Sequence, residues 1–109
     1  MALGTFSFDA WLMALKTADS PQAVEARLDH VAALSRKLLD VRMRFTRISG
    51  PRWAYLAGER EDLSPSAFPA REELTDGVGL LSNLHERLAP DECEQVLGVL
   101  RKLANGEPI

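Results

Sequence analysis

The chain has 109 residues, of which 46% are hydrophobic and 27% are charged, and its formal net charge is −3. This balance is typical of an ordinary globular protein and excludes a disordered tail. The length predicts a single domain over residues 1–109, with a core small enough to gain stability from a second copy of the chain.

The first predicted element is a helix that begins at Ser7. Its apolar residues recur at the spacing of one helical face, and they are Phe8, Trp11, Leu12 and Leu15. Ser7 fits the N-cap position of this helix. Phe6 and Trp11 then occupy the two positions of a hydrophobic staple, which fixes the angle at which a chain enters a helix.

A long helix from Ser20 to Ile48 is the most informative predicted element. An apolar seam with alternating spacings of three and four residues runs along it, comprising Val31, Leu34, Leu38, Val41, Phe45 and Ile48. Ser20-Pro21 supplies a start signal, and Gly50-Pro51 supplies a stop signal. A helix of about 42 Å usually organises a helical bundle and often a dimer. We therefore expect the six seam residues to form a homodimer interface.

The second half of the chain extends the helical prediction. Residues Arg52 to Ala57 are expected to add one or two helical turns, and Gly58 to Pro69 to form the main loop. Further helices are predicted at about 69–88 and from Pro90 to the stop signal Asn105-Gly106. The predicted fold class is all-α: a small bundle of about four to five helices organised on the one long heptad-patterned helix.

Positive charge is concentrated in the middle of the chain. Residues 36–52 carry a net charge of +5, whereas residues 1–35 carry −2 and residues 53–109 carry −6. The basic side chains of this stretch are Arg36, Lys37, Arg42, Arg44, Arg47 and Arg52. They fit a solvated face, an acidic protein partner or nucleic acid. The acidic total makes nucleic acid the least favoured of the three.

The sequence holds few groups suited to catalysis, so we expect no enzyme, no cofactor and no metal centre. His30 and His85 are 55 positions apart and lack the close spacing of a helical metal site, so both are expected to be structural. Cys93 falls on the inner stripe of the last predicted helix, where a buried and inert thiol is expected. Gly77-Val78-Gly79 lacks the further residues of a phosphate-binding loop.

The expected location is the cytoplasm. No window of the sequence approaches 18 consecutive apolar residues, so no membrane-spanning helix is predicted. The first 20 residues lack the basic and apolar regions of a signal peptide. The single cysteine also excludes an intrachain disulfide.

The predicted function is a non-catalytic regulatory module that binds another protein, as an adaptor, an anti-activator or an inhibitor of a regulator such as a transcription regulator. Aromatic and arginine side chains beside a loop are typical of binding hot spots. The predicted protein-binding residues are Trp53, Tyr55, Leu56, Phe68, Arg42 and Arg44. The competing interpretation is that Trp53, Tyr55, Leu56 and Phe68 are structural and close the end of the bundle. The alternative function is a nucleic-acid-binding transcriptional or nucleoid regulator that uses the basic stretch 36–52.

Overall fold

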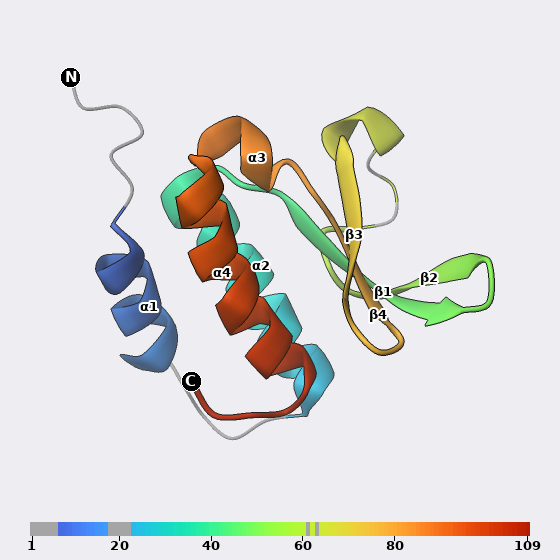
Figure 1. The fold of residues 1–109 in the computed structure, drawn as a ribbon, viewed down its shortest axis with the longest axis horizontal. Helices are drawn as coiled ribbons and strands as arrows, with labels where there is room; N and C mark the ends of the chain where they lie inside the picture. The colour runs from blue at the N-terminus through green and yellow to red at the C-terminus, as the bar shows by residue number, and fades with distance from the viewer. Residues whose placement is uncertain (1–6, 18–22, 61, 63) are drawn as a thin grey trace.

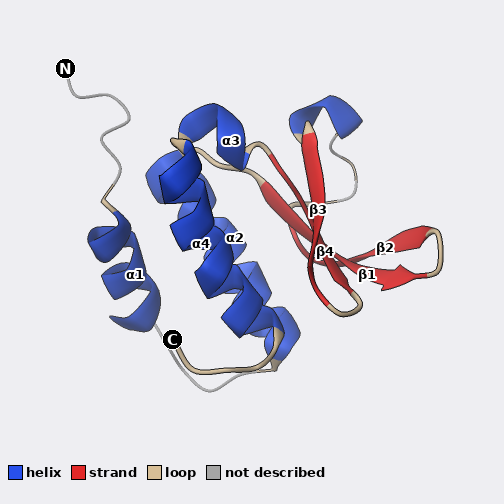
Figure 2. Cartoon of the chain, viewed as in Figure 1, coloured by secondary structure: helices blue, strands red, loops and turns tan. Residues whose placement is uncertain are grey.

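The computed structural model describes residues 7–17, 23–60, 62 and 64–109. Over these residues the chain combines helices with a four-stranded antiparallel sheet, so the fold is α+β. The prediction of an all-α helical bundle is therefore wrong. Figure 1 shows the helices α1, α2 and α4 gathered on one side of the sheet, and Figure 2 shows the same division by type of element.

The sheet is built from two hairpins that meet along its centre. Its strands are β1 (Met43–Ser49), β2 (Arg52–Gly58), β3 (Ala70–Thr75) and β4 (Val78–Ser82). The strand order is β2-β1-β4-β3, and each neighbouring pair is antiparallel. The two central strands are therefore β1 and β4, and the two edge strands are β2 and β3.

The described residues also form four α-helices and one 3₁₀ turn. They are α1 (Phe8–Thr17), α2 (Val24–Leu39), the 3₁₀ turn η1 (Pro65–Ala67), α3 (Leu84–Arg87) and α4 (Pro90–Ala104). The helix α2 contacts β1 and β2, and α4 contacts β3. The helix α1 packs on α2 and α4 on the side away from the sheet (Figure 1). No helix of the described residues is long and apolar enough to cross a membrane.

The core fills the space between the helices and one face of the sheet. Its largest fully buried side chains include Trp11, Phe45, Leu28, Met43, Leu80, Leu100 and Leu103. Trp11 fixes α1 to α2, because its indole nitrogen donates a hydrogen bond of 3.1 Å to the buried Oγ of Ser35. Aliphatic and aromatic burial on this scale is the main stabilising term of a small domain.

Two predicted helices are confirmed. The hydroxyl of Ser7 accepts a bond of 3.2 Å from the backbone amide of Ala10, so Ser7 caps α1 as expected. The last helix begins at Pro90 and ends with Asn105 as its C-cap. The predicted staple involves Phe6, and the predicted start of the long helix is Ser20-Pro21. These residues lie outside the described ranges.

The predicted long helix is wrong beyond Leu39. Asp40 adopts the left-handed conformation, with φ of 55°, and ends α2 as its C-cap. The chain then continues as β1, in which Met43 and Phe45 are fully buried. The spacing of two residues between buried positions is that of a strand, and it prevails over the heptad spacing because one face of β1 packs on the helices.

The six seam residues are consequently divided between elements. Val31, Leu34 and Leu38 lie on α2, Val41 lies in the connection, and Phe45 and Ile48 lie on β1. Val31, Val41 and Phe45 are fully buried in the core, whereas Leu38 is 49% exposed. The seam is therefore not one line along a helix.

The helices predicted at 52–57 and 69–88 are also wrong. The first segment lies in β2, and Gly50-Pro51 forms the tight connection of the β1–β2 hairpin instead of a helix stop. The second segment forms β3, β4 and the short α3. Asp76-Gly77 connects β3 to β4, with Gly77 at a φ of +79° that favours glycine. Within the predicted loop from Gly58 to Pro69, Gly58 ends β2, Pro65–Ala67 form η1, and the other described residues belong to no helix or strand.

Candidate functional site

The sheet has a core face and an outer face, and the strand register assigns residues to each. Met43 and Phe45 of β1 lie on the core face, so Arg44, Thr46 and Ile48 point to the outer face. Residues paired directly across strands share a face. The register therefore adds to the outer face the residues Trp53, Tyr55, Arg71, Glu73, Gly79 and Leu81.

One end of the outer face is covered by the connection between β2 and β3. These strands are the opposite edges of the sheet, so the chain passes from one edge to the other between Gly58 and Ala70. The guanidinium of Arg44 anchors this crossing, because it donates to the backbone oxygens of Glu59 and Arg60. The same group lies 4.6 Å from the ring centroid of Phe68, which is only 7% exposed. This end of the outer face is therefore covered and is not available to a partner.

Trp53 dominates the remaining part of the outer face. Its ring lies over Gly79 of β4, where a Cβ atom would come within 2.7 Å of the ring atom Cε3 and 2.8 Å of the Thr46 hydroxyl. The absence of a side chain at Gly79 is what allows the indole to approach β4 so closely. From the opposite edge, the Arg71 guanidinium stacks on the indole at 4.4 Å from its centroid.

These side chains form a surface that we call the outer patch: Ile48, Trp53, Tyr55, Arg71 and Leu81. Tyr55 is 39% exposed, Arg71 is exposed, and the other three are half-buried. The Tyr55 hydroxyl donates a bond of 2.8 Å to the carbonyl of Gly58, so its ring is held in place. The patch is thus an ordered apolar surface with a cationic group stacked on it.

The Thr46 hydroxyl lies under this patch and is buried with no hydrogen-bond partner among the described residues. A buried polar atom without a partner costs about 1–3 kcal/mol. Thr46→Val keeps the shape and removes the hydroxyl, so it should raise the free energy of unfolding by about 1 kcal/mol in urea denaturation.

Thr75 offers the matched control for this prediction. Its hydroxyl donates a bond of 2.9 Å to Asn105 Oδ1, so Thr75→Val should lower the stability instead. A loss of stability in Thr46→Val comparable to that in Thr75→Val would show that the Thr46 hydroxyl is satisfied.

The structure brings together only part of the predicted protein-binding set. Trp53 and Tyr55 lie side by side on the outer face, as neighbours on β2. Leu56 lies at the irregularity in the β1–β2 register and packs against the core. Phe68 is buried under Arg44, and both hold the crossing connection.

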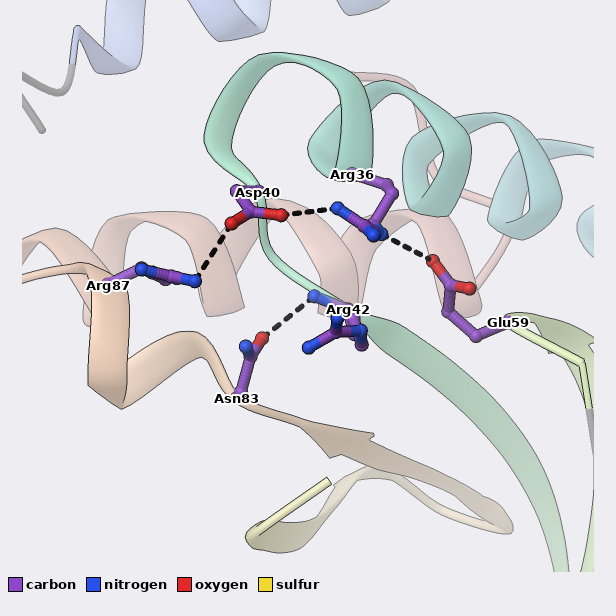
Figure 3. Close-up of polar contacts among 6 residues, drawn as sticks. All are labelled: Arg36, Asp40, Arg42, Glu59, Asn83 and Arg87. Carbon is purple, nitrogen blue, oxygen red and sulfur yellow. Dashed lines mark hydrogen bonds and ion pairs between the residues drawn. The ribbon is translucent and has the colours of Figure 1, made fainter. Parts of the chain in front are cut away.

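Arg42, the remaining member of that set, lies in a polar cluster where α2 passes into β1 (Figure 3). Its backbone amide donates to Asn83 Oδ1 at 2.8 Å, and the amide of Asn83 returns a bond to the carbonyl of Arg42. Asp40 accepts bonds from Arg36 and, at 2.8 Å, from Arg87. The cluster joins α2, β1 and α3, so its contacts are structural.

The basic stretch 36–52 does not form a continuous surface. Arg36 pairs with Asp40 and lies 4.0 Å from a carboxylate oxygen of Glu59. Arg44 is engaged in the crossing connection. Arg47 and Arg52 are exposed near the tip of the β1–β2 hairpin, beyond the helical layer (Figure 1). The charges are therefore divided between two ends of the sheet.

The environment of Cys93 is unfavourable for a nucleophilic thiol. Cys93 is half-buried, and its Sγ lies 3.7 Å from the carbonyl of Leu88. Burial raises the pKa of the Cys93 thiol, and nearby carboxylates raise it further, namely Glu92, Glu72, Glu94 and Asp91. This opposes the thiolate that a nucleophile needs. His85 is exposed, and the Nε2 atom of His30 is buried without a hydrogen-bond partner among the described residues.

Sequence reasoning assigned neither Arg71 nor Leu81 to a binding site, and it placed Ile48 in the seam. It considered Gly79 only within a predicted helix and as part of an incomplete phosphate-loop motif. The signal that could have found them is Asp76-Gly77, a favoured hairpin dipeptide, followed by a short apolar run. A hairpin at this position would have made Gly79 a strand glycine, which often marks the close approach of another group.

Comparison with known proteins gives no further information about the outer patch, because no family model, no curated protein and no solved structure matches the chain significantly.

Proposed function

We propose that this chain is a non-catalytic protein-binding module that engages its partner through the outer patch. The observation that supports this most strongly is Trp53, whose ring lies against Gly79 on the outer face of the sheet with the Arg71 guanidinium over it. Tryptophan, tyrosine and arginine are the residues most enriched at binding hot spots. The proposal keeps a regulatory role as adaptor, anti-activator or inhibitor, and the cytoplasm as the expected location.

The rigidity of the patch supports binding. The backbone of β1, β2 and β4 holds Ile48, Trp53 and Leu81 in hydrogen-bonded ladders. The tryptophan ring contacts both Gly79 and the Arg71 guanidinium. Side chains that are ordered before binding lose less conformational entropy when the partner arrives.

The chemistry of the patch indicates the kind of partner. Its half-buried apolar side chains favour an aliphatic or aromatic side chain of the partner. Among the described residues the Arg71 guanidinium makes no ion pair and no hydrogen bond, so its donors are available to a carboxylate. We therefore expect a protein segment that presents an apolar residue beside an acidic one.

The test compares proteins captured from a cell lysate by the wild type and by three variants. Trp53→Ala and Arg71→Gln alter the outer patch, whereas Leu38→Ala removes an apolar side chain that is 49% exposed on α2. A specific partner should be retained by the wild type and Leu38→Ala and lost by both patch variants. Truncation of a hot-spot tryptophan typically weakens binding by more than about 2 kcal/mol, or about thirtyfold.

Equal capture by Trp53→Ala and the wild type would contradict the proposal. Each variant is first checked by circular dichroism, because only folded proteins can be compared. Capture that is lost in Leu38→Ala alone would place the binding surface on the helical layer instead of the outer face.

The nucleic-acid alternative has one observation in its favour. An open antiparallel sheet with an aromatic ring and a stacked arginine is also a surface on which single-stranded bases can stack. The net charge of −3 and the division of the basic stretch weigh against it. Complexes that disappear on nuclease treatment, or whose affinity falls steeply with added salt, would favour this alternative.

A further inference from the structure

A groove lies between α1 and α4, on the helical side of the molecule. The two helices lie side by side and run in the same direction (Figure 1). The groove has a volume of about 450 Å³, which is within the range of small-molecule binding sites. Its lining residues are Phe8, Leu12 and Lys16 of α1, Gln95, Gly98, Val99 and Lys102 of α4, and Ile109.

The groove has an apolar part and a cationic end. Phe8 and Leu12 line it while they pack against the core, and Val99 is buried beside them. Lys16 follows Leu12 by four residues, and Lys102 follows Val99 by three, so each lysine lies one turn further along the same helical face. Because the two helices run in the same direction, both lysines lie at the same end of the groove.

Gly98 shows that part of this space is unfilled. A Cβ atom added at this position has no atom within 4 Å. Glycine in the interior of a helix lowers its stability relative to alanine, and no neighbouring group among the described residues requires the small size of glycine here. The position therefore adds room to the groove and makes no close packing contact.

The charges around the groove favour an anionic group at its cationic end. A second hollow of about 200 Å³ shares Lys16 and Ile109 with the groove and adds Arg27. The charged residues that line the two hollows are all basic, and no acidic residue is among those that line them. Neither Lys16 nor Lys102 forms an ion pair with a carboxylate of the described residues. An anion at this end would therefore meet two ammonium groups that are not already paired.

We propose that the groove binds a fatty acid, with its alkyl chain between Leu12 and Val99 and its carboxylate beside Lys16 and Lys102. A fatty acid matches both parts of the groove, because it joins an unbranched apolar chain to one negative charge. The lining of α1 from Phe8 to Lys16 extends over about 12 Å, which suits an alkyl chain of medium length. The proposal does not rest on the protein-binding function, because the groove and the outer patch are different surfaces.

The test is an NMR titration of the isotope-labelled protein with decanoate, kept below the concentration at which decanoate forms micelles. The amide resonances of Leu12, Gly98 and Val99 should shift and reach saturation, and that of Trp53 should stay. Octanoate should bind more weakly than decanoate, because each methylene group that is buried tightens binding by about fourfold.

Two variants separate the apolar contribution from the ionic one. Gly98→Leu should fill the groove and weaken decanoate binding by at least about tenfold, and α4 should be retained because leucine favours a helix more than glycine does. Replacing Lys16 and Lys102 together by glutamine should weaken decanoate binding by about fivefold at low salt and leave the binding of uncharged decanol unchanged. Lys37→Gln is the matched control, because this lysine is exposed on α2 and lines neither hollow.

Shifts that do not saturate at millimolar decanoate would overturn the proposal, and so would equal binding by Gly98→Leu and the wild type. Weakening in Lys37→Gln as large as in the double lysine variant would overturn the carboxylate position, by showing that only the net charge matters. Sedimentation velocity without ligand tests for a different occupant. A wild-type dimer that Gly98→Leu abolishes would overturn the proposal, because it would assign the groove to a second copy of the chain.

Discussion

Trp11→Ala is expected to lower the free energy of unfolding by about 3–5 kcal/mol, the range for removal of a buried aromatic side chain. Trp11 is 1% exposed and fills the space between α1 and the rest of the core. The same change leaves the buried Ser35 hydroxyl without the indole donor that lies 3.1 Å away. Because small domains have stabilities of about 5–15 kcal/mol, this loss removes a large part of the total stability.

Trp11→Phe separates the two contributions. Phenylalanine keeps most of the apolar volume but cannot donate to Ser35, so the loss should be about 1–3 kcal/mol. Urea denaturation of the wild type and both variants measures the effect. Losses below 1 kcal/mol for Trp11→Ala would mean that α1 is not docked on α2 and α4 as the structure has it.

Gly79→Ala is expected to displace the Trp53 ring from the outer face and to lower stability by about 1–3 kcal/mol, the usual range for overpacking. The new methyl group would lie within 2.8 Å of the Thr46 hydroxyl and in collision with the indole. The ring can avoid the collision only by moving away from β4, and this disturbs its contact with the Arg71 guanidinium. The stability and the binding surface are therefore affected together.

The chain holds two tryptophans, so two indole N–H resonances report on Gly79→Ala in an NMR spectrum. The resonance of Trp53 should shift and that of Trp11 should stay. Gly98→Ala is the matched control, because Gly98 lies within α4 with no atom within 4 Å of an added Cβ, and there alanine should stabilise the helix by up to about 1 kcal/mol. An unchanged Trp53 resonance in Gly79→Ala would contradict the close contact between ring and glycine.

The sequence allowed the prediction of the helices whose ends are marked by local signals. Ser7 before an apolar stripe predicts α1, and Pro90 with Asn105-Gly106 predicts α4. In both helices the local preference and the burial pattern agree, and local interpretation is reliable in such cases.

The sheet was missed because its strands carry two compatible spacings. Val41, Phe45 and Ile48 continue the heptad spacing of α2, but Val41, Met43 and Phe45 alternate with arginines at the spacing of a strand. Val41, Met43 and Phe45 are fully buried, whereas Ile48 is half-buried, and this is the burial pattern of a strand. The choice depends on packing against helices far along the chain, and no local window contains that information.

The candidate site was predicted only in its aromatic part. Trp53 and Tyr55 were singled out because aromatic side chains near a loop are often binding anchors. Their neighbours Arg71 and Gly79 come from strands that pairing brings beside them, 18 and 26 positions away from Trp53 in the chain. Such proximity depends on sheet topology, so it could not be inferred once the segment had been assigned to a helix.

The most direct test of the central claim is an NMR titration of the isotope-labelled protein with a partner that the capture experiment isolates. The claim is that the outer patch is the binding surface, so the largest chemical-shift changes should cluster at Ile48, Trp53, Arg71 and Leu81. Residues of α1 and α4 should change little. Shift changes concentrated on the helical layer, with the Trp53 indole resonance unmoved, would contradict the account.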